Sequence, residues 1–411
     1  MRILFIVEHF PCISETFVLN QVTGLIDRGH EVEVFPLGRP VAPVVHPDFT
    51  KYDLLARTWK GPNIPPAWSS RIGRAAAQLP RCLGRFTIPT LRALNVFQYG
   101  RQAANLVLFY SLLPFLDNHG EYDIILCHFG DNAPLVQLWK DWGVIRGKLV
   151  VVFHAHEMAG LSDAQSRKLY GELFASDALL LPVTNYWRES LLRWGAAPER
   201  TRVHRMGVDC ERFDYHPRPI IPNEPIQLLS VCRLTEMKGT EYAIRAVAKL
   251  RPRHPGLRYT IGGAGPLRDH LERLISQLGV RDAVTLAGPL PQDKVAALLR
   301  EAHIYLVPSV TDSIGCQEGL PVALMEALAA GVPAIGTRHA GIPELISDRV
   351  TGLLVEERDV DGLAHAIESL VGDPQLCLKI GTQGRAAVER DYNITKLNEG
   401  LENLFRSELA A

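Results

Sequence analysis

The 411-residue sequence lacks the marks of several large classes of protein. Its seven cysteines are scattered, odd in number and without a CxxC pair, which is typical of a reduced cytosolic protein and argues against a zinc site. It has no low-complexity tract, and its net charge of −1 provides no overall attraction to nucleic acid or to membranes. Because a chain of this length exceeds one ordinary core, we expect two domains.

Long apolar runs are also missing. The longest one after the N-terminus, Leu106–Leu116, is well short of the roughly 20 residues that a membrane span needs. The opening segment MRILFIVEHF is interrupted by Glu8 and His9 and has no small-residue cleavage site, so a buried strand is favoured over a signal peptide. The sequence therefore predicts a protein that is not integral to a membrane.

Acidic residues are absent between Leu54 and Leu116. This stretch carries the cations Arg57, Lys60, Arg71, Arg74, Arg81, Arg85, Arg92 and Arg101, interleaved with the aromatic residues Trp59, Trp68, Phe86, Phe97, Tyr99, Phe109, Tyr110 and Phe115. The pattern favours contact with anionic lipid, where each surface cation contributes about 1 kcal/mol. The alternative is a helical insertion with aromatic residues in its core and solvated arginines. Nucleic acid is not an expected partner, because no recognised nucleic-acid module surrounds the patch.

Short apolar strands alternate with helical patterns in both halves, which predicts α/β architecture with parallel sheets. The expected strands are Ile3–Val7, Glu31–Pro36, Ile124–Cys127, Leu149–His154 and Leu179–Val183, then Gln227–Val231, Arg258–Ile261, Val284–Ala287, Ile304–Val307, Ala334–Gly336 and Gly352–Val355. Helices are expected at Phe17–Arg28, Glu241–Leu250 and Leu267–Leu278.

Four prolines in His216–Pro225 indicate the join between the two halves. We expect an N-terminal domain over 1–215, with an insertion at about 54–116, and a C-terminal domain over 216–390. A final helix over 391–411 is expected to pack back towards the N-terminal domain. Two doubly wound sheets joined in this way leave a ligand cleft between their carboxyl strand ends.

The most informative motif is EGLPVALMEALAAG, from Glu318 to Gly331. Pro321 suits a first helical turn and Gly331 suits a helix exit, so we expect a short helix between them. Glu326 then lies on the helix and Glu318 lies in the loop before it, with an axial rise of about 12 Å between them. A folded-back nucleotide sugar needs a similar distance between its hexose hydroxyls and its ribose diol. The free amides at the helix start can meet a phosphate or sugar oxygen.

Two further turns support a phosphate ligand. Arg233 and Lys238 lie between a strand and a helix, where a guanidinium fork and an ammonium can hold a diphosphate. The GGAGP turn at Gly262–Pro266 lets the backbone approach a phosphate or a base. Because that turn lacks GxGxxG spacing, a nicotinamide cofactor is not indicated.

These motifs, followed by HAGIPE at His339–Glu344, resemble those of the retaining family-4 glycosyltransferases with the GT-B fold, and the match covers 226–385. The N-terminal half resembles the bacterial exopolysaccharide members, including colanic-acid and amylovoran-type transferases. The residues that carry this second resemblance are Pro11–Phe17, Asn20, Gln21, His128–Gly130, Phe153, His154 and His204–Asp209. The resemblance implies two Rossmann-like domains, with the acceptor on the N-terminal one and the donor on the C-terminal one.

The resemblance also implies roles for individual residues. Arg233 and Lys238 would neutralise the donor diphosphate, and Glu326 would accept hydrogen bonds from the ribose hydroxyls. Glu318 and the amides of Gly319 and Leu320 would hold the transferred sugar. The residues near the base would be Gly262, Gly263, Leu290 and Ser309.

In the N-terminal half, His154 would face the sugar, and Ser14 and Glu15 would lie near the donor phosphate or the acceptor. This first loop departs from the family pattern, since Pro11-Cys-Ile-Ser14 replaces a Gly-Gly pair. We expect the Ser14 hydroxyl to substitute for a backbone contact with phosphate.

The implied reaction is transfer of a hexosyl unit, with retention, from a nucleoside diphosphate sugar. No carboxylate can be assigned as a nucleophile, so we expect departure of the diphosphate on the front face, without metal or cofactor. A UDP-sugar is favoured over a GDP-sugar. The expected acceptor is a polyprenyl-diphosphate-linked saccharide, with the protein cytoplasmic and peripheral to the inner face of the plasma membrane. Two alternatives stay open: a same-fold nucleotide-sugar epimerase, and a non-catalytic scaffold of a polysaccharide assembly complex.

Overall fold

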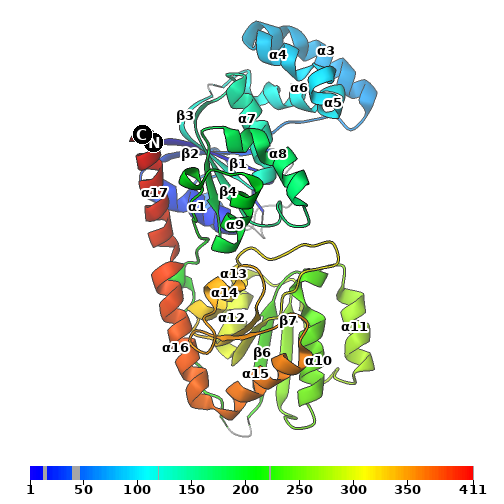
Figure 1. Ribbon diagram of the computed structural model, residues 1–411, viewed down its shortest axis with the longest axis vertical. Coiled ribbons are helices and arrows are strands. Elements are labelled where there is room, and N and C mark those ends of the chain that lie inside the picture. Colours follow the sequence, from blue (N-terminus) through cyan, green and yellow to red (C-terminus); the bar gives the residue numbers. More distant parts are fainter. Residues whose placement is uncertain (13–15, 39–46, 119, 222–223, 411) are drawn as a thin grey trace.

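Two parallel sheets form two α/β domains that lie end to end (Figure 1). The computed structural model describes residues 1–12, 16–38, 47–118, 120–221 and 224–410. The first sheet has the strand order β2-β1-β3-β4-β5, and the second has the order β11-β10-β9-β6-β7-β8. Every predicted strand is present, with ends that differ by a few residues, so the predicted pair of doubly wound sheets is confirmed.

The strands are β1 (Arg2–Val7), β2 (Glu31–Pro36), β3 (Glu121–His128), β4 (Arg146–Phe153), β5 (Leu179–Pro182), β6 (Ile226–Val231), β7 (Leu257–Gly262), β8 (Val284–Gly288), β9 (Ile304–Val307), β10 (Ala334–Thr337) and β11 (Leu353–Val355). Most are continuous apolar runs, because helices cover both faces of a parallel sheet. In β1, for example, the side chains of Ile3 to Val7 are all completely buried.

The helices of the N-terminal domain are α1 (Thr16–Asp27), α2 (Pro47–Lys51), α3 (Trp68–Arg85), α4 (Thr87–Ala93), α5 (Val96–Ala104), α6 (Val107–Leu112), α7 (Ala133–Asp141), α8 (Asp163–Ala175) and α9 (Asn185–Trp194). Those of the C-terminal domain are α10 (Thr240–Leu250), α11 (Arg268–Gln277), α12 (Gln292–Glu301), α13 (Val322–Ala329), α14 (Ile342–Leu345), α15 (Val360–Gly372) and α16 (Pro374–Asp391), followed by α17 (Ile394–Ala410).

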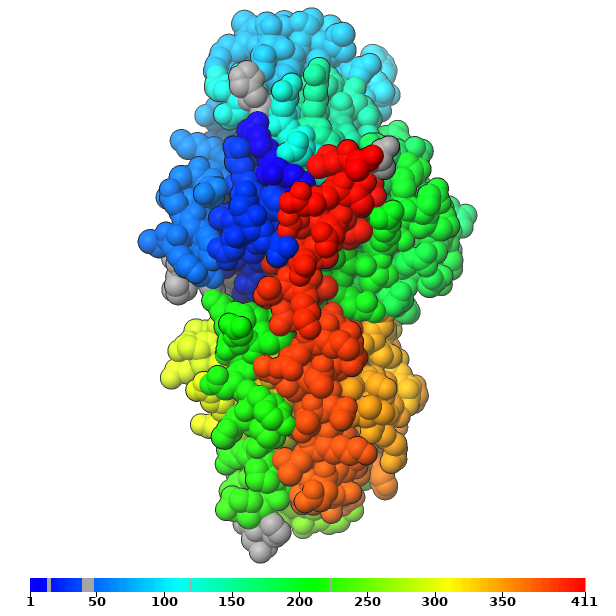
Figure 2. Space-filling view, turned by 90° about the vertical axis from the view of Figure 1, so that its left-hand side faces the viewer, coloured from blue at the N-terminus to red at the C-terminus, as the bar shows by residue number. Residues whose placement is uncertain are grey.

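The chain crosses between the domains a second time near its C-terminus. Helix α16 belongs to the C-terminal domain, whereas α17 runs back along the N-terminal domain (Figure 2). There Glu402 forms an ion pair with Arg28, the residue after α1, and Glu408 forms one with Lys148 of β4 at 3.2 Å. Asn398 lies so close to Gly24 of α1 that a Cβ at Gly24 would meet its side chain at 1.9 Å. The C-terminal helix therefore ties the two domains together.

Helices α3 to α6 form the basic insertion, at the end of the N-terminal domain that points away from the C-terminal domain (Figure 1). Some of its aromatic side chains are core: Phe109, Tyr110 and Phe115 are buried. Others are exposed, and Phe97 is 99% exposed and Trp68 50% exposed. No helix within the described ranges is long and apolar enough to cross a membrane.

Candidate functional site

The loop before α13 lies at the centre of the predicted donor site. Helix α13 begins after Pro321, and Gly331 adopts a φ of +81° just beyond its end, where a side chain would be strained. Glu318 lies in the preceding loop and is only 5% exposed. The structure thus forms the helix that the sequence predicts, with the first carboxylate before it and Glu326 on it.

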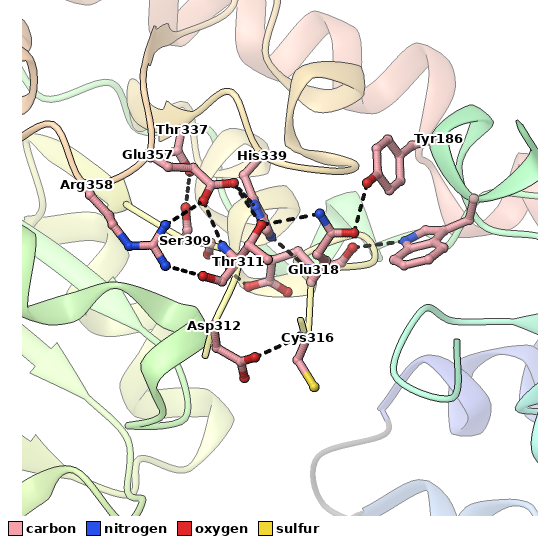
Figure 3. A network of polar contacts seen from close by, with 12 residues as sticks. Tyr186, Ser309, Thr311, Asp312, Cys316, Glu318, Thr337, His339, Glu357 and Arg358 are labelled. Carbon is pink, nitrogen blue, oxygen red and sulfur yellow. Dashed lines mark hydrogen bonds and ion pairs between the residues drawn. The ribbon is translucent and has the colours of Figure 1, made fainter. Parts of the chain in front are cut away.

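Three of the predicted site residues meet at the Glu318 carboxylate, and Figure 3 shows two of them, Ser309 and Glu318. The ammonium of Lys238 lies 2.5 Å from Oε1, and the hydroxyl of Ser309 donates to the same oxygen at 2.9 Å. Burial disfavours the carboxylate anion, but the Lys238 charge and these two hydrogen bonds outweigh that effect and lower the pKa of Glu318. Glu318 is therefore held as an anion next to a cation.

The backbone of Glu318 is also fixed, by one side chain from each domain. Its N–H donates to Nε2 of His339 at 2.9 Å, and its carbonyl oxygen accepts from the indole Nε1 of Trp187 in α9 at 3.0 Å. In contrast, the amides of Gly319 and Leu320 donate to no acceptor within the described part of the chain. These two amides remain available to an anionic or polar ligand at the start of α13.

His154 directly follows β4 and lies opposite this loop. A Cβ at Gly319 would meet the His154 carbonyl oxygen at 2.2 Å, so the two domains touch here and only glycine fits. The ring of His154 packs between Phe17 and Phe129, at centroid distances of 4.8 and 4.6 Å. Its Nε2 lies 3.0 Å from Nδ1 of His128, which leaves Nδ1 of His154 for a ligand.

Glu157 holds the backbone around this histidine pair. One carboxylate oxygen accepts from the amide of His154 at 2.7 Å and from that of Gly130 at 3.0 Å. Burial raises the pKa of Glu157 to about 7 and lowers that of His128 to about 3. Burial also lowers the pKa of His154 well below its usual value, so the site favours the neutral form of both imidazoles.

The glycines of the GGAGP turn are required by packing within the C-terminal domain. A Cβ at Gly263 would meet the Cys232 carbonyl oxygen at 1.8 Å, and one at Gly262 would meet the Leu290 side chain at 2.4 Å. Gly263 also has a φ of +137°, which side chains rarely adopt. The turn therefore brings Gly262, Gly263 and Leu290 together beside the strand end that leads to Arg233.

Two of the predicted donor residues, Arg233 and Glu326, have side chains that form no ion pair or hydrogen bond within the described ranges. Arg233 is exposed and has no ion pair within the described ranges. Burial raises the pKa of Glu326 to about 7, against a weaker opposing influence of Arg212. Both groups can therefore change their interactions when an anion or a diol binds. Ser14 and Glu15 lie outside the described residues.

A second set of contacts joins the domains beside the site. The carboxylate of Glu344 in α14 accepts from the Asn185 side chain at 2.9 Å and from the Tyr186 amide at 3.1 Å, both at the start of α9. The hydroxyl of Tyr186 donates to Gln317, next to Glu318, at 2.8 Å. Helix α9 is thus held against the Glu318 loop.

Sequence reasoning missed Trp187, Tyr186 and Glu357, and it quoted His339 without a role. A signal exists for His339 and Glu357, since these polar residues follow the neighbouring parallel strands β10 and β11. Polar side chains at the carboxyl ends of neighbouring parallel strands meet at one edge. The position of Trp187 on an apolar helix face carries no comparable signal.

Comparisons with known proteins agree with this geometry. The family described as "Glycosyltransferase Family 4" matches residues 14–212, and that described as "Glycosyl transferases group 1" matches residues 211–387. The chain is 36% identical to the putative colanic acid biosynthesis glycosyltransferase WcaL of Escherichia coli, over 99% of this chain and 100% of that protein. It is 35% identical to the amylovoran biosynthesis glycosyltransferase AmsK of Erwinia amylovora, over 96% of each chain.

Two solved structures share the fold at low sequence identity. HepE of Anabaena, in complex with UDP, aligns with a TM-score of 0.72 and 16% identity over 99% of this chain and 100% of its own. A sucrose-phosphate synthase of Thermosynechococcus elongatus aligns with a TM-score of 0.74 and 19% identity over 100% of this chain and 99% of its own. These likenesses confirm the predicted GT-B architecture.

Proposed function

The chain belongs to the family-4 glycosyltransferases, and we propose that it transfers a hexosyl unit, with retention, from a nucleoside diphosphate sugar to a saccharide acceptor. The observation that carries this proposal is the arrangement at the start of α13. A buried Lys238–Glu318 pair lies beside two free amides, opposite His154 of the other domain. Together these groups offer a cation to the diphosphate and hydrogen-bond partners to the sugar.

In the proposed reaction the diphosphate leaves from the face that the acceptor hydroxyl approaches. Lys238 uses one N–H for Glu318, so two remain for phosphate oxygens, and Arg233 is free to form a bidentate contact. These charges stabilise the leaving diphosphate, whose oxygen takes the acceptor proton. Because two side-chain cations neutralise that charge, the mechanism requires no metal and no cofactor.

The sugar is held by the other side of the same loop. Oε1 of Glu318 is occupied by Lys238 and Ser309, whereas Oε2 has no partner among the described residues. Oε2 and the amides of Gly319 and Leu320 are therefore the groups that anchor sugar hydroxyls. Nδ1 of His154 faces the sugar from the N-terminal domain.

The nucleotide is assigned to the C-terminal domain. Glu326 accepts hydrogen bonds from the ribose diol, and the base lies near Gly262, Gly263 and Leu290. UDP is the first candidate, supported by the bound UDP in HepE, and GDP is the second. Ser14 and Glu15 are proposed to contact phosphate or acceptor.

For the acceptor we propose a polyprenyl-diphosphate-linked saccharide of bacterial exopolysaccharide synthesis, the process named for WcaL and AmsK. The enzyme would work in the cytoplasm, at the inner face of the plasma membrane. The exposed cations and apolar side chains of α3 to α5 support contact with anionic lipid. Because these helices point away from the C-terminal domain, membrane contact and acceptor linkage are separate claims that need separate tests (Figure 1).

Thermal stabilisation of the purified protein tests donor binding. UDP, GDP, ADP, UDP-glucose, UDP-galactose and GDP-mannose would each be added without metal. We expect one nucleotide and its sugar conjugate to raise the melting temperature, and the Arg233→Ala variant to lose most of that shift. If no compound stabilises the wild-type protein, the donor assignment is wrong.

A further inference from the structure

We propose that His339, oriented by Glu357, is a positioning residue that aims the free amide of Gly319 at the transferred sugar. This inference rests on the proposed function, because it gives a role to residues behind the loop that binds the sugar. His339 itself is 1% exposed and cannot touch the donor. Its effect must pass through the backbone of Glu318.

The hydrogen bonds of His339 define one tautomer. Nε2 accepts from the Glu318 amide at 2.9 Å and therefore carries no proton. The proton is on Nδ1, which donates to Oε1 of Glu357 at 2.6 Å. A buried imidazole with both nitrogens engaged in this way has a single orientation, as required of a group that positions another (Figure 3).

Glu357 is itself fixed by its neighbours. Its Oε2 accepts from the Thr311 amide at 2.8 Å, and its Oε1 accepts from the Thr311 hydroxyl at 3.2 Å. Arg358 lies 3.4 Å from Oε2. Burial disfavours the Glu357 anion, but the hydrogen bonds from His339 and Thr311 outweigh it and lower the pKa of Glu357. The carboxylate is thus a stationary acceptor for the His339 proton.

Because peptide units are planar, the hydrogen bonds that fix Glu318 also fix the direction of the free Gly319 amide. The Glu318 N–H belongs to the peptide unit of Gln317 and Glu318, and His339 fixes that plane. The Glu318 carbonyl shares the next plane with the Gly319 N–H, and Trp187 fixes that one through a 3.0 Å hydrogen bond. With two successive planes held, the direction of the Gly319 amide is set before a ligand binds.

Hydrogen bonds continue from this point to the other domain. Gln317 donates to the Thr311 hydroxyl at 3.3 Å and accepts from Tyr186 at 2.8 Å. Figure 3 shows these residues as one network around Glu318. Preorganised donors of this kind lower a barrier because they do not reorganise during the reaction, and a displacement of about 1 Å can cost about 100-fold in rate.

Two substitutions at position 339 separate positioning from packing. His339→Gln places an amide oxygen near the position of Nε2 and can still accept from the Glu318 amide. His339→Asn keeps a donor near the position of Nδ1 for Glu357 but does not reach Glu318. The two side chains are both smaller than histidine and neutral, so each is the control for the other.

The assay compares three quantities: kcat, KM for the donor and the dissociation constant of UDP. The donor is whichever of UDP-glucose and UDP-galactose the wild-type enzyme prefers. We expect His339→Asn to lower kcat about 10- to 100-fold, with UDP affinity within about twofold of wild type, because Arg233 and Glu326 are untouched. His339→Gln should recover most of the kcat. Glu357→Gln should lower kcat by less, since its amide oxygen can still accept from His339, and only the acceptor for the Thr311 amide is lost.

Equal losses in His339→Asn and His339→Gln, or losses of UDP affinity that follow the melting temperature, would assign His339 to structure alone and overturn the inference. Wild-type kcat in His339→Asn would overturn it as well. If the wild-type protein neither binds UDP nor consumes a UDP-hexose, the proposed function fails first, and the inference with it.

Discussion

Half-buried Lys238 and buried Glu318 form an ion pair at the proposed donor site, with 2.5 Å between the ammonium nitrogen and Oε1. The sequence suggests separate partners for them, the diphosphate and the sugar. Their pairing means instead that the phosphate-binding cation and the sugar-binding loop are held together before the donor arrives. A change at either residue must therefore affect both stability and donor binding.

Lys238→Met should destabilise the protein, because it leaves the Glu318 carboxylate buried without its cation. The expected loss is about 3 kcal/mol of unfolding free energy, measured by urea denaturation. The double variant Lys238→Met/Glu318→Gln should recover most of this loss, since no unpaired charge remains. Additive losses in the double variant would show that the pair contributes nothing to stability.

Because the Trp187 indole donates a hydrogen bond to the Glu318 carbonyl oxygen, we expect α9 to affect catalysis. Trp187→Phe removes one hydrogen bond across the domains and should lower kcat about three- to tenfold, because the Gly319 peptide plane is less restricted. Trp194→Phe is the matched control, since its indole donates to Asp163 within the N-terminal domain. Equal kcat values in both variants would argue against a role for α9.

Glu326 predicts a pH dependence of nucleotide affinity. Its pKa of about 7 means that the unliganded carboxyl is largely protonated below that pH, whereas the ribose diol prefers the ionised acceptor. Affinity measured by calorimetry should therefore rise from pH 6 to pH 8, by up to about tenfold per unit below the pKa. Glu326→Gln should bind more weakly, with a flat profile. A wild-type profile that is equally flat would remove the ribose role.

The Glu326 carboxyl should also make the stability of the protein depend on pH, but in the opposite direction: stability falls as pH rises, whereas nucleotide affinity increases. Because its folded-state pKa is raised above the usual value of 4.5, the folded protein binds the proton more tightly than the unfolded chain. The stability that Glu326 contributes is present below pH 4.5 and is lost as pH rises to about 7. Glu326→Gln should therefore be more stable than wild type at pH 8 and similar at pH 4.5, as measured by thermal unfolding at both pH values.

The insertion predicts binding to anionic vesicles. Arg74 and Arg92 are exposed, as are Leu91 and Phe97 of the same insertion. Arg74→Glu/Arg92→Glu should therefore weaken sedimentation with phosphatidylglycerol vesicles about thirtyfold or more, at roughly 1 kcal/mol per cation. Arg71 is not suitable for substitution in this test, because its guanidinium donates hydrogen bonds to the Pro65 and Asn105 carbonyls within the insertion.

The matched control for the insertion is Arg273→Glu/Arg281→Glu, two exposed arginines of the C-terminal domain. This control variant should sediment like the wild-type protein. In 0.5 M salt both proteins should be released from the vesicles, because the Debye length falls to about 4 Å and the charges are screened. Unchanged binding of the Arg74/Arg92 variant would show that α3 to α5 are a solvated insertion.

Most of the fold could be predicted from local patterns. Apolar runs and glycine or proline boundaries define the strands and α13, and each half has enough of them to specify a doubly wound sheet. On the donor side, the position of Lys238 between a strand and a helix and that of Glu318 in the loop before α13 indicate a site, whereas Ser309 is implied only by the family resemblance.

Contacts between residues far apart in the chain could not be predicted from the sequence. The pairing of Lys238 with Glu318 joins residues 80 positions apart, and Trp187 with Glu318 joins residues 131 positions apart. The first contact depends on tertiary packing within the C-terminal domain, and the second depends on the relative placement of the two domains. The periodicity of single elements encodes neither. The partial burial of the insertion likewise reflects packing against the rest of the N-terminal domain, since Phe109 and Tyr110 are core while Phe97 is not.

The most direct test of the central claim is turnover by the intact protein. Release of UDP from the preferred UDP-hexose would be measured with bacterial membranes as the source of acceptor, for wild type and for Lys238→Ala. We predict release by wild type and a rate at least about 100-fold lower in Lys238→Ala. Nucleotide binding without release by wild type, or equal rates in both proteins, would contradict a glycosyltransferase site at Glu318.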